Sequence, residues 1–153
     1  EKLFGVFPHH VRGGRDGLLR GFNDETPVPV SRHTEVRRGD LPDVAGLSVL
    51  LESDETGLCL IRDEARRQIY MFNHLEYDTA TLADEYHRDV AAGMEIGLPA
   101  YYFPDDDPSR APINRWRAHA NVLFGNWIND LYQSTSFELA DIPVPRPPPR
   151  QSG

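Results

Sequence analysis

The residues best suited to chemistry in this chain are a histidine and a glutamate, His74 and Glu76, separated by one position. They follow the apolar run 69–72 and precede Asp78, a residue type typical of helix N-caps. Open α/β sheets build their sites in loops that follow the carboxyl ends of strands. A carboxylate beside a histidine orients the ring and stabilises the imidazolium that forms when the histidine takes a proton. The pattern predicts the base and carboxylate of a nucleophilic triad, although polar pairs at this spacing also occur on surfaces without a role.

A triad also needs a nucleophile, and the single thiol of the chain is Cys59. The segment Gly57-Leu58-Cys59-Leu60-Ile61 partly resembles a G-x-C-x-G nucleophile elbow. The fit fails at Ile61, because the elbow needs a small residue there and a helix directly after it. A free cysteine in an apolar run is typical of a protein core. We therefore expect this chain to carry the base and not the nucleophile.

The elements that must position these residues are strands followed by helices. Apolar runs predict strands at 3–7, 47–51, 58–61 and 68–72, with a polar hairpin turn at 63–67 and a further extended stretch near 30–36. The Gly- and Pro-rich segment 8–30 is expected to form a long loop. Helical periodicity predicts helices over 79–92, between Asp78 as N-cap and Gly93 as stop, and over 113–133. Strands interleaved with helices indicate an α/β class, and the small number of helices indicates part of a doubly wound domain.

The composition limits the classes of protein to which this chain can belong. The 153 residues match one domain, and their net charge of −8 argues against a nucleic-acid binder or a polybasic membrane-surface protein. No apolar stretch reaches the ~20 residues that span a bilayer. One cysteine excludes an intrachain disulfide and a cysteine-rich zinc site, and suits a reducing cytoplasm. The chain begins without Met or a signal peptide, so we expect either processing or the C-terminal part of a larger protein.

Other candidate sites have simpler interpretations. The pair His9-His10 and the run 105–107 suggest a metal site, but successive aspartates point in different directions, and a solvated loop is the better interpretation. No metal site is therefore predicted. Trp116 and Trp127 are expected to be core anchors on one helix face. The residues 140–153 form a proline-rich tail that we expect to be disordered.

Several separated motifs, in order, carry a resemblance to a known family. The segment 73–90 reads NHLEYDTATLADEYHRDV, and further matching segments read EKLFGV (1–6), LRGFND (19–24), SRHTEV (31–36), YFPDDDP (102–108), WRAH (116–119) and LFGNWIN (123–129). Over residues 1–139 the chain resembles the C-terminal half of the homoserine O-succinyltransferase (homoserine O-acyltransferase) family, whose signature reads G-H-P-E-Y-D followed by T-L-x-x-E and, two residues on, R-D.

The resemblance implies a fold and a reaction. The fold would be class I glutamine-amidotransferase-like (flavodoxin-like), with a sheet and flanking helices. The reaction would be ping-pong transfer of an acyl group from succinyl-CoA or acetyl-CoA to the γ-hydroxyl of L-homoserine, the first committed step of methionine biosynthesis, in the cytoplasm. The acyl-CoA is a co-substrate and no cofactor is implied; a homodimer is expected.

Site residues carry over position by position. His74 and Glu76 match the histidine and glutamate of a Cys-His-Glu triad, and Lys2, Ser31 and Arg88 match substrate-binding positions. A substrate-binding role for Arg88 is physically reasonable, because an arginine can bind a carboxylate with two hydrogen bonds. On residues alone, Arg88 could equally pair with Asp84 on a helix surface.

The sequence departs from the family pattern in three ways. The family's cysteine would lie upstream of Glu1, and Asn73 and Leu75 replace the glycine and proline of the signature. The acyl donor therefore stays open, and the isolated chain is predicted to be inactive. Two alternatives also stay open: a non-catalytic fragment or binding module that lacks the nucleophile, and a glutaminase-type amide hydrolase of the same fold.

Overall fold

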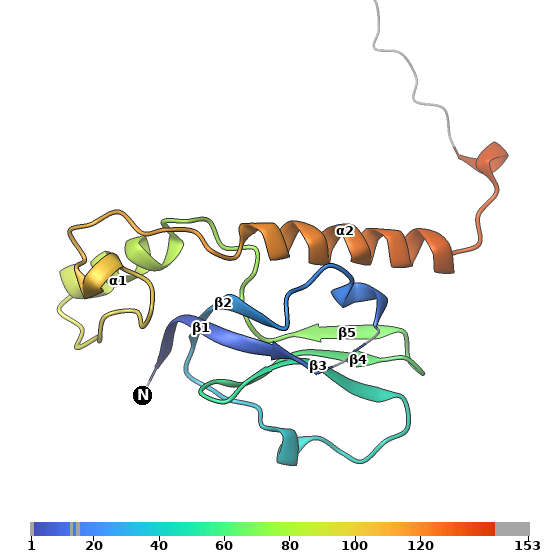
Figure 1. Cartoon of the computed structure of the whole chain (residues 1–153), viewed down its shortest axis with the longest axis horizontal. Helices are drawn as coiled ribbons and strands as arrows, with labels where there is room; N and C mark the ends of the chain where they lie inside the picture. Colours follow the sequence, from blue (N-terminus) through green and yellow to red (C-terminus); the bar gives the residue numbers. More distant parts are fainter. Residues whose placement is uncertain (1, 13, 15, 143–153) are drawn as a thin grey trace, which may run out of the picture.

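The computed structural model describes residues 2–12, 14 and 16–142. Its centre is a five-stranded sheet with the order β2-β1-β3-β4-β5, in which all neighbouring strands are antiparallel. The strands are β1 (Leu3–Val11), β2 (Glu25–Arg32), β3 (Leu47–Ser53), β4 (Gly57–Asp63) and β5 (Gln68–Met71). Figure 1 shows the long helix α2 (Arg117–Ser134) running along one face of this sheet, with α1 (Thr81–Ala91) beyond one end.

A mixed α/β architecture with flanking helices is confirmed, but the strand pairing differs from that of a doubly wound sheet. One parallel contact does exist, because the segment before Tyr101 joins the start of β1. Val6 N–H donates to Ala100 O at 2.8 Å, and Ala100 N–H donates to Phe4 O at 2.9 Å. Gly5 permits this approach: a Cβ there would lie 2.3 Å from Ala100 O. The glutamine-amidotransferase-like arrangement stays a prediction.

The expected long loop at 8–30 is wrong. β1 continues through Pro8 to Val11, and β2 pairs with it from Glu25 to Arg32, so that Pro8 faces Pro27. Prolines cannot donate to a ladder and are tolerated where one side of a strand is unpaired. β2 is an edge strand, and β1 pairs with β3 only at its last two residues, which explains why these prolines fit. His9, expected in a solvated loop, is consequently 0% exposed.

The predicted hairpin with its turn at 63–67 is confirmed, and a second hairpin, which was not predicted, precedes it. β3 and β4 pair from Leu47–Asp63 to Ser53–Gly57, with register shifts between Val49 and Glu52, and β4 and β5 pair from Asp63–Gln68 onward. The polar turn between β4 and β5 is closed by Asp63, whose carboxylate accepts the Arg66 backbone N–H at 2.9 Å. This turn fixes where β5 begins, and thereby where the His74 segment leaves the sheet.

Both helices exist, but each begins later than predicted. At α1, Ala80 occupies the N-cap without a side-chain hydrogen bond, and Asp78 supplies only its carbonyl, to Thr81 N–H at 3.2 Å. Gly93 follows the helix with φ +75°, as expected of a C-terminal stop. At α2, the Asn114 side chain accepts Arg117 N–H at 2.8 Å, which sets the start of the helix.

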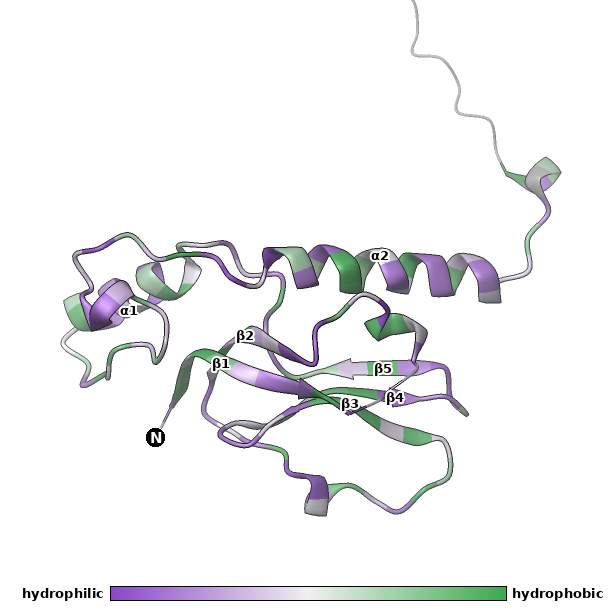
Figure 2. Ribbon diagram, in the orientation of Figure 1, coloured by the Kyte–Doolittle hydropathy of each residue, from purple (hydrophilic) through white to green (hydrophobic). Residues whose placement is uncertain are grey.

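The core lies between the sheet and the helical segments, and Figure 2 shows apolar residues on the strands and on parts of both helices. Its largest member is Trp116, 1% exposed, whose indole N–H donates to Tyr77 O at 2.8 Å. Trp127 is 42% exposed, so the prediction of a second tryptophan anchor is wrong. Other fully buried members are Val6, Leu18, Val28, Leu50, Leu51, Leu58, Leu60, Leu75 and Leu82.

Two further predictions concern the proline-rich tail and membrane-spanning segments. At the start of the predicted tail 140–153, Leu139–Asp141 forms a short 3-10 turn, and 143–153 lie outside the described residues. Among residues 2–12, 14 and 16–142, no helix combines the length and the apolar character needed to cross a bilayer.

Candidate active site

The structure brings His74 and Glu76 together in the turn that follows β5. Imidazole Nδ1 lies 2.8 Å from the Glu76 carboxylate Oε1. A carboxylate only accepts, so Nδ1–H donates, and in the neutral ring Nε2 then carries the lone pair. The His74 ring also stacks on Tyr77, with centroids 4.3 Å apart and planes 9° apart. The pair has the geometry of a base with its orienting carboxylate.

The local sequence explains why this turn presents its polar side chains outward. Inward and outward residues alternate: Asn73 and Leu75 are 3% and 1% exposed, whereas His74 and Glu76 are partly open. The backbone N–H of His74 donates to Pro29 O on β2 at 2.9 Å. Asn73 does not adopt a positive φ. The turn therefore forms without the glycine and proline of the family signature.

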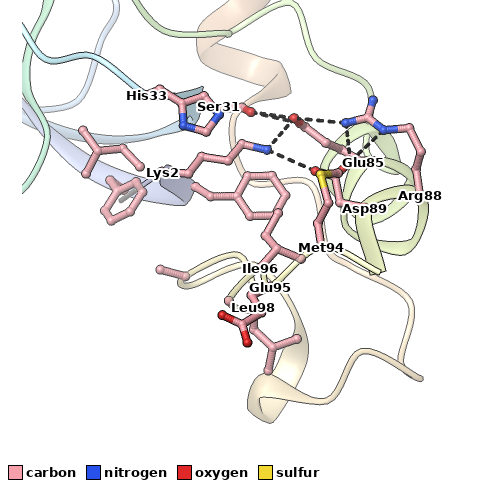
Figure 3. Close-up of a pocket in the computed structure, with 15 residues that line it drawn as sticks. Lys2, Ser31, His33, Glu85, Arg88, Asp89, Met94, Glu95, Ile96 and Leu98 are labelled. Carbon is pink, nitrogen blue, oxygen red and sulfur yellow. Dashed lines mark hydrogen bonds and ion pairs between the residues drawn. The ribbon is translucent and has the colours of Figure 1, made fainter. Parts of the chain in front are cut away.

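Lys2, Ser31 and Arg88 gather around one carboxylate, that of Glu85 on α1 (Figure 3). Lys2 Nζ lies 2.7 Å from Glu85 Oε1, and the Ser31 hydroxyl donates to the same carboxylate at 2.9 Å. Arg88 Nη2 lies 3.8 Å from it. Residues from the segment before β1, from β2 and from α1 therefore meet at one place.

Asp89 completes this charged cluster. It is 4% exposed and holds Arg88 Nη2 at 2.6 Å, with Lys2 Nζ at 3.6 Å. The hydrogen bond from Arg88 holds the pKa of the Asp89 carboxyl below its usual range. The partners of Arg88 are thus Glu85 and Asp89, and not Asp84 as the surface alternative supposed.

Glu85 and Asp89 were missed by the sequence reasoning. A signal was present, because Glu85 lies three residues before Arg88 and therefore on the same helix face. Acidic residues on a short helix are ordinarily solvated, and nothing in α1 alone shows that Lys2 and Ser31 reach them. The contact depends on how β1 and β2 lie against α1.

The cluster lines an open cavity of about 800 Å³. Figure 3 shows Lys2, Ser31 and Arg88 directed toward Glu85 and Asp89, with the segment 94–98 below them. That segment supplies an apolar wall through Met94, Ile96 and Leu98, together with Phe4. A neighbouring hollow is lined by Glu85 and Arg88 again, and by Tyr77, the residue on which His74 stacks. Tyr77 thereby lies between the histidine pair and the charged cluster.

Cys59 is in the core, as predicted. It is 0% exposed, and burial raises the pKa of its thiol to about 12. A thiol with such a pKa stays protonated at neutral pH and is inert as a nucleophile. Among the described residues, His, Cys, Asp and Glu form no group of three that could hold a metal ion.

The fold defines a mixed α/β protein that carries a histidine–glutamate pair and a charged pocket, and comparison with known proteins gives the family. The model of the homoserine O-succinyltransferase family matches residues 1–137. The chain belongs to this family.

Individual relatives carry a related name. The chain is 55% identical to a homoserine O-acetyltransferase of Allorhizobium ampelinum over 142 residues, which is 93% of this chain and 46% of that protein. It is 52% identical to a homoserine O-acetyltransferase of Rhizorhabdus wittichii, over 99% of this chain and 47% of the relative. The chain spans about half the length of these relatives.

A solved structure is similar in fold. The chain titled "Crystal structure of SMU.1228c" matches with a TM-score of 0.55 at 16% sequence identity, over 86% of this chain and 53% of that one. At this identity the similarity supports the mixed α/β fold alone.

Proposed function

We propose that this chain supplies the general base and much of the amino-acid pocket of a homoserine O-acyltransferase. The observation that carries the proposal is the 2.8 Å contact between His74 Nδ1 and Glu76, next to a pocket built by Lys2, Ser31 and Arg88. Family membership supports the reaction class. The fold would be of the class I glutamine-amidotransferase type, as that membership suggests.

The chemistry would run in two steps. A cysteine thiol gives its proton to Nε2 of His74 and attacks the thioester carbonyl of an acyl-CoA, so that the acyl group moves to the cysteine and CoA leaves with the proton. His74 then takes the proton of the homoserine γ-hydroxyl, whose oxygen attacks the acyl-cysteine and regenerates the thiol. Glu76 stabilises the imidazolium formed in each step. Because Cys59 is buried, we place the nucleophile in the half of the relatives that this chain does not span.

The pocket suits an amino acid. Homoserine carries an α-ammonium and an α-carboxylate at one end and an uncharged hydroxyl at the other. Arg88 can hold the carboxylate with two hydrogen bonds, and Glu85 can accept from the ammonium. Lys2 and Ser31, now bonded to Glu85, supply donors for the remaining polar atoms. The apolar wall at 94–98 leaves room for the uncharged part of the substrate.

The acyl donor is tested by comparison of acetyl-CoA with succinyl-CoA. Acetyl-CoA is the first choice because the relatives at 52–55% identity are named acetyltransferases, whereas the family description names succinyl. From family membership we also propose action at the start of methionine biosynthesis, in the cytoplasm, as a homodimer.

The deciding experiment measures O-acylhomoserine formed by the complete gene product that contains this chain. His74→Ala should lower turnover by about 10³-fold or more, since the general base is lost, and Glu76→Ala should also collapse turnover. His87→Ala, an exposed histidine on α1, is the matched control and should keep the wild-type rate. Wild-type rates in both His74→Ala and Glu76→Ala would end the assignment.

The same assay separates the remaining alternatives. Glutamine consumption without homoserine consumption would indicate an amide hydrolase of the same fold. For residues 1–153 alone we expect no acyl transfer, because Cys59 is buried and protonated. An acyl group found on Cys59 by intact-mass spectrometry after incubation with acyl-CoA would contradict that expectation.

A further inference from the structure

A buried polar contact adjoins the His74–Glu76 turn and takes no part in the chemistry above. Asn73, the residue before His74, is 3% exposed, and His9 on β1 is 0% exposed. Asn73 Nδ2 lies 2.8 Å from His9 Nε2. Two polar side chains in a core cost free energy unless they hydrogen-bond each other, and an apolar pair would avoid that cost.

The direction of this hydrogen bond is fixed by the surroundings of His9. Its Nδ1 lies 2.9 Å from the backbone oxygen of Phe7, which can only accept, so Nδ1 carries the proton. Nε2 is then the acceptor, and the Asn73 amide donates to it. Burial lowers the pKa of His9 to about 4, so the neutral ring that this arrangement needs is present at neutral pH.

His74 is held on both sides by buried groups. Before it, Asn73 ties the chain to β1 through His9. At its own backbone, the N–H donates to Pro29 O on β2 at 2.9 Å. After it, Leu75 is 1% exposed in the core. The imidazole thus projects from a segment of three residues that is fixed to two strands and the core.

Stability alone does not account for Asn73. Its Oδ1 is buried without a hydrogen-bond partner among the described residues, and an unsatisfied buried oxygen lowers stability. The glycine of the family signature has no side chain with which to reach His9. An asparagine here therefore supplies a directional link between β1 and the start of the turn, at some expense of stability.

We propose that His9 and Asn73 are positioning residues for His74, and that their hydrogen bond sets the start of the turn so that Nδ1–H of His74 meets Glu76. This inference rests on the proposed function for its consequence in catalysis, because His74 is there the general base. The pair itself touches neither substrate nor nucleophile.

Steady-state kinetics of the complete gene product tests the proposal. Asn73→Leu and His9→Leu should each lower kcat for homoserine acylation about 10–100-fold, since displacement of a base by about 1 Å has effects of that size. KM for homoserine should change less than about twofold, because Lys2, Ser31 and Arg88 are untouched. His9→Gln keeps an acceptor near the position of Nε2 and should retain kcat within about threefold.

The matched control is Thr26→Val. Thr26 is 0% exposed, faces His9 across the β1–β2 pair, and has a hydroxyl without a partner among the described residues. The substitution changes the polarity of the same part of the core without touching the turn, so kcat should stay at the wild-type value. A loss in Thr26→Val as large as in Asn73→Leu would overturn the proposal, as would full kcat in folded Asn73→Leu and His9→Leu.

A second readout keeps this inference separate from the proposed function. The His74 ring stacks on Tyr77 at 4.3 Å, so its ring protons should resonate upfield in the wild type and in Thr26→Val, and move toward the free-histidine position in Asn73→Leu. His74→Gln assigns the signals. If the wild type acylates no homoserine, the proposed function fails and the chemical shifts alone decide about positioning: the shift in Asn73→Leu supports it, and unchanged shifts in that variant overturn it.

Discussion

The His74–Glu76 turn and the charged cluster around Glu85 hold their functional side chains in different ways. In the turn, buried neighbours on either side of His74 fix the backbone, and the two polar side chains then meet at 2.8 Å. In the cluster, Lys2, which precedes β1, and Arg88 on α1 hold Glu85 and Asp89 through ion pairs at 2.6 to 3.8 Å. Ser31 on β2 adds a hydrogen bond to Glu85. The first arrangement suits a base that must keep one orientation, and the second suits donors that exchange partners when a substrate enters.

This difference between the turn and the cluster predicts which kinetic constant each region should control. With His74 as the proposed base, a change in the anchors of the turn should displace it in every catalytic state and so lower kcat. With the cluster as the proposed amino-acid pocket, a change there should weaken contacts to the substrate and so raise KM. Substitutions in the two regions should therefore separate into two kinetic classes.

The largest effect on stability should come from Leu75→Ala in the turn. Leu75 is 1% exposed, and truncation of a buried leucine costs about 2–5 kcal/mol through lost burial and the cavity that remains. The free energy of unfolding, measured by urea denaturation, checks this. Val90→Ala, on the exposed side of α1, is the control and should cost less than about 1 kcal/mol. Equal losses in the two variants would show that the turn is not anchored in the core.

The buried His9 should make stability depend on pH in a defined window. Its pKa is about 4 in the folded chain against an ordinary 6.5, chiefly because of burial, with smaller contributions from Arg32 and His10. Between these values the unfolded chain binds a proton that the folded chain does not. The contribution of His9 to the free energy of unfolding is therefore fully present above about pH 6.5. About 3 kcal/mol of it is lost as the pH falls to about 4.

Unfolding midpoints at pH 7, 6, 5 and 4 in wild type and His9→Gln measure this contribution. The variant should show a much flatter profile, with a residual slope from His119, whose pKa is also lowered by burial. The carboxyls of Asp63, Asp89 and Asp107 have lowered pKa values and act below this window. Parallel profiles in wild type and His9→Gln would contradict the buried neutral state of His9.

The smallest effect, and the one that defines the second kinetic class, is expected from Arg88→Ala. Loss of a bidentate pair of hydrogen bonds to a substrate carboxylate should raise KM for homoserine about 10–100-fold. The value of kcat should change less than about threefold. Arg88→Lys should recover only part of the loss, since a lysine cannot form the paired contact. Arg117→Ala, on an exposed position of α2, is the control. A fall in kcat with unchanged KM would place Arg88 in the same class as the turn.

Local patterns predicted much of this fold, and long-range contacts escaped prediction. The β4–β5 hairpin depends on residues close in sequence, so its pattern was sufficient. The spacing of His74 and Glu76 made their contact a candidate but did not establish it. The β1–β2 ladder was missed because Pro8 and Pro27 indicate loops unless the strand carrying them is known to lie at an edge.

The candidate site shows the same limit. Lys2, Ser31 and Arg88 entered by resemblance, and nothing in their spacing shows that they converge on Glu85. His9 and Asn73 are 64 residues apart, and their contact follows from the strand order, which sequence patterns did not provide. A single sequence therefore does not identify those polar residues of a site whose partners lie on distant strands.

Chemical rescue of His74→Ala tests the central claim most directly. The complete gene product carrying this substitution is assayed for O-acylhomoserine with acetyl-CoA or succinyl-CoA, with and without added imidazole. We predict a loss of about 10³-fold or more, partly restored by imidazole in proportion to its unprotonated form, because the missing function is that of a base. Wild-type turnover in His74→Ala without imidazole would contradict the account.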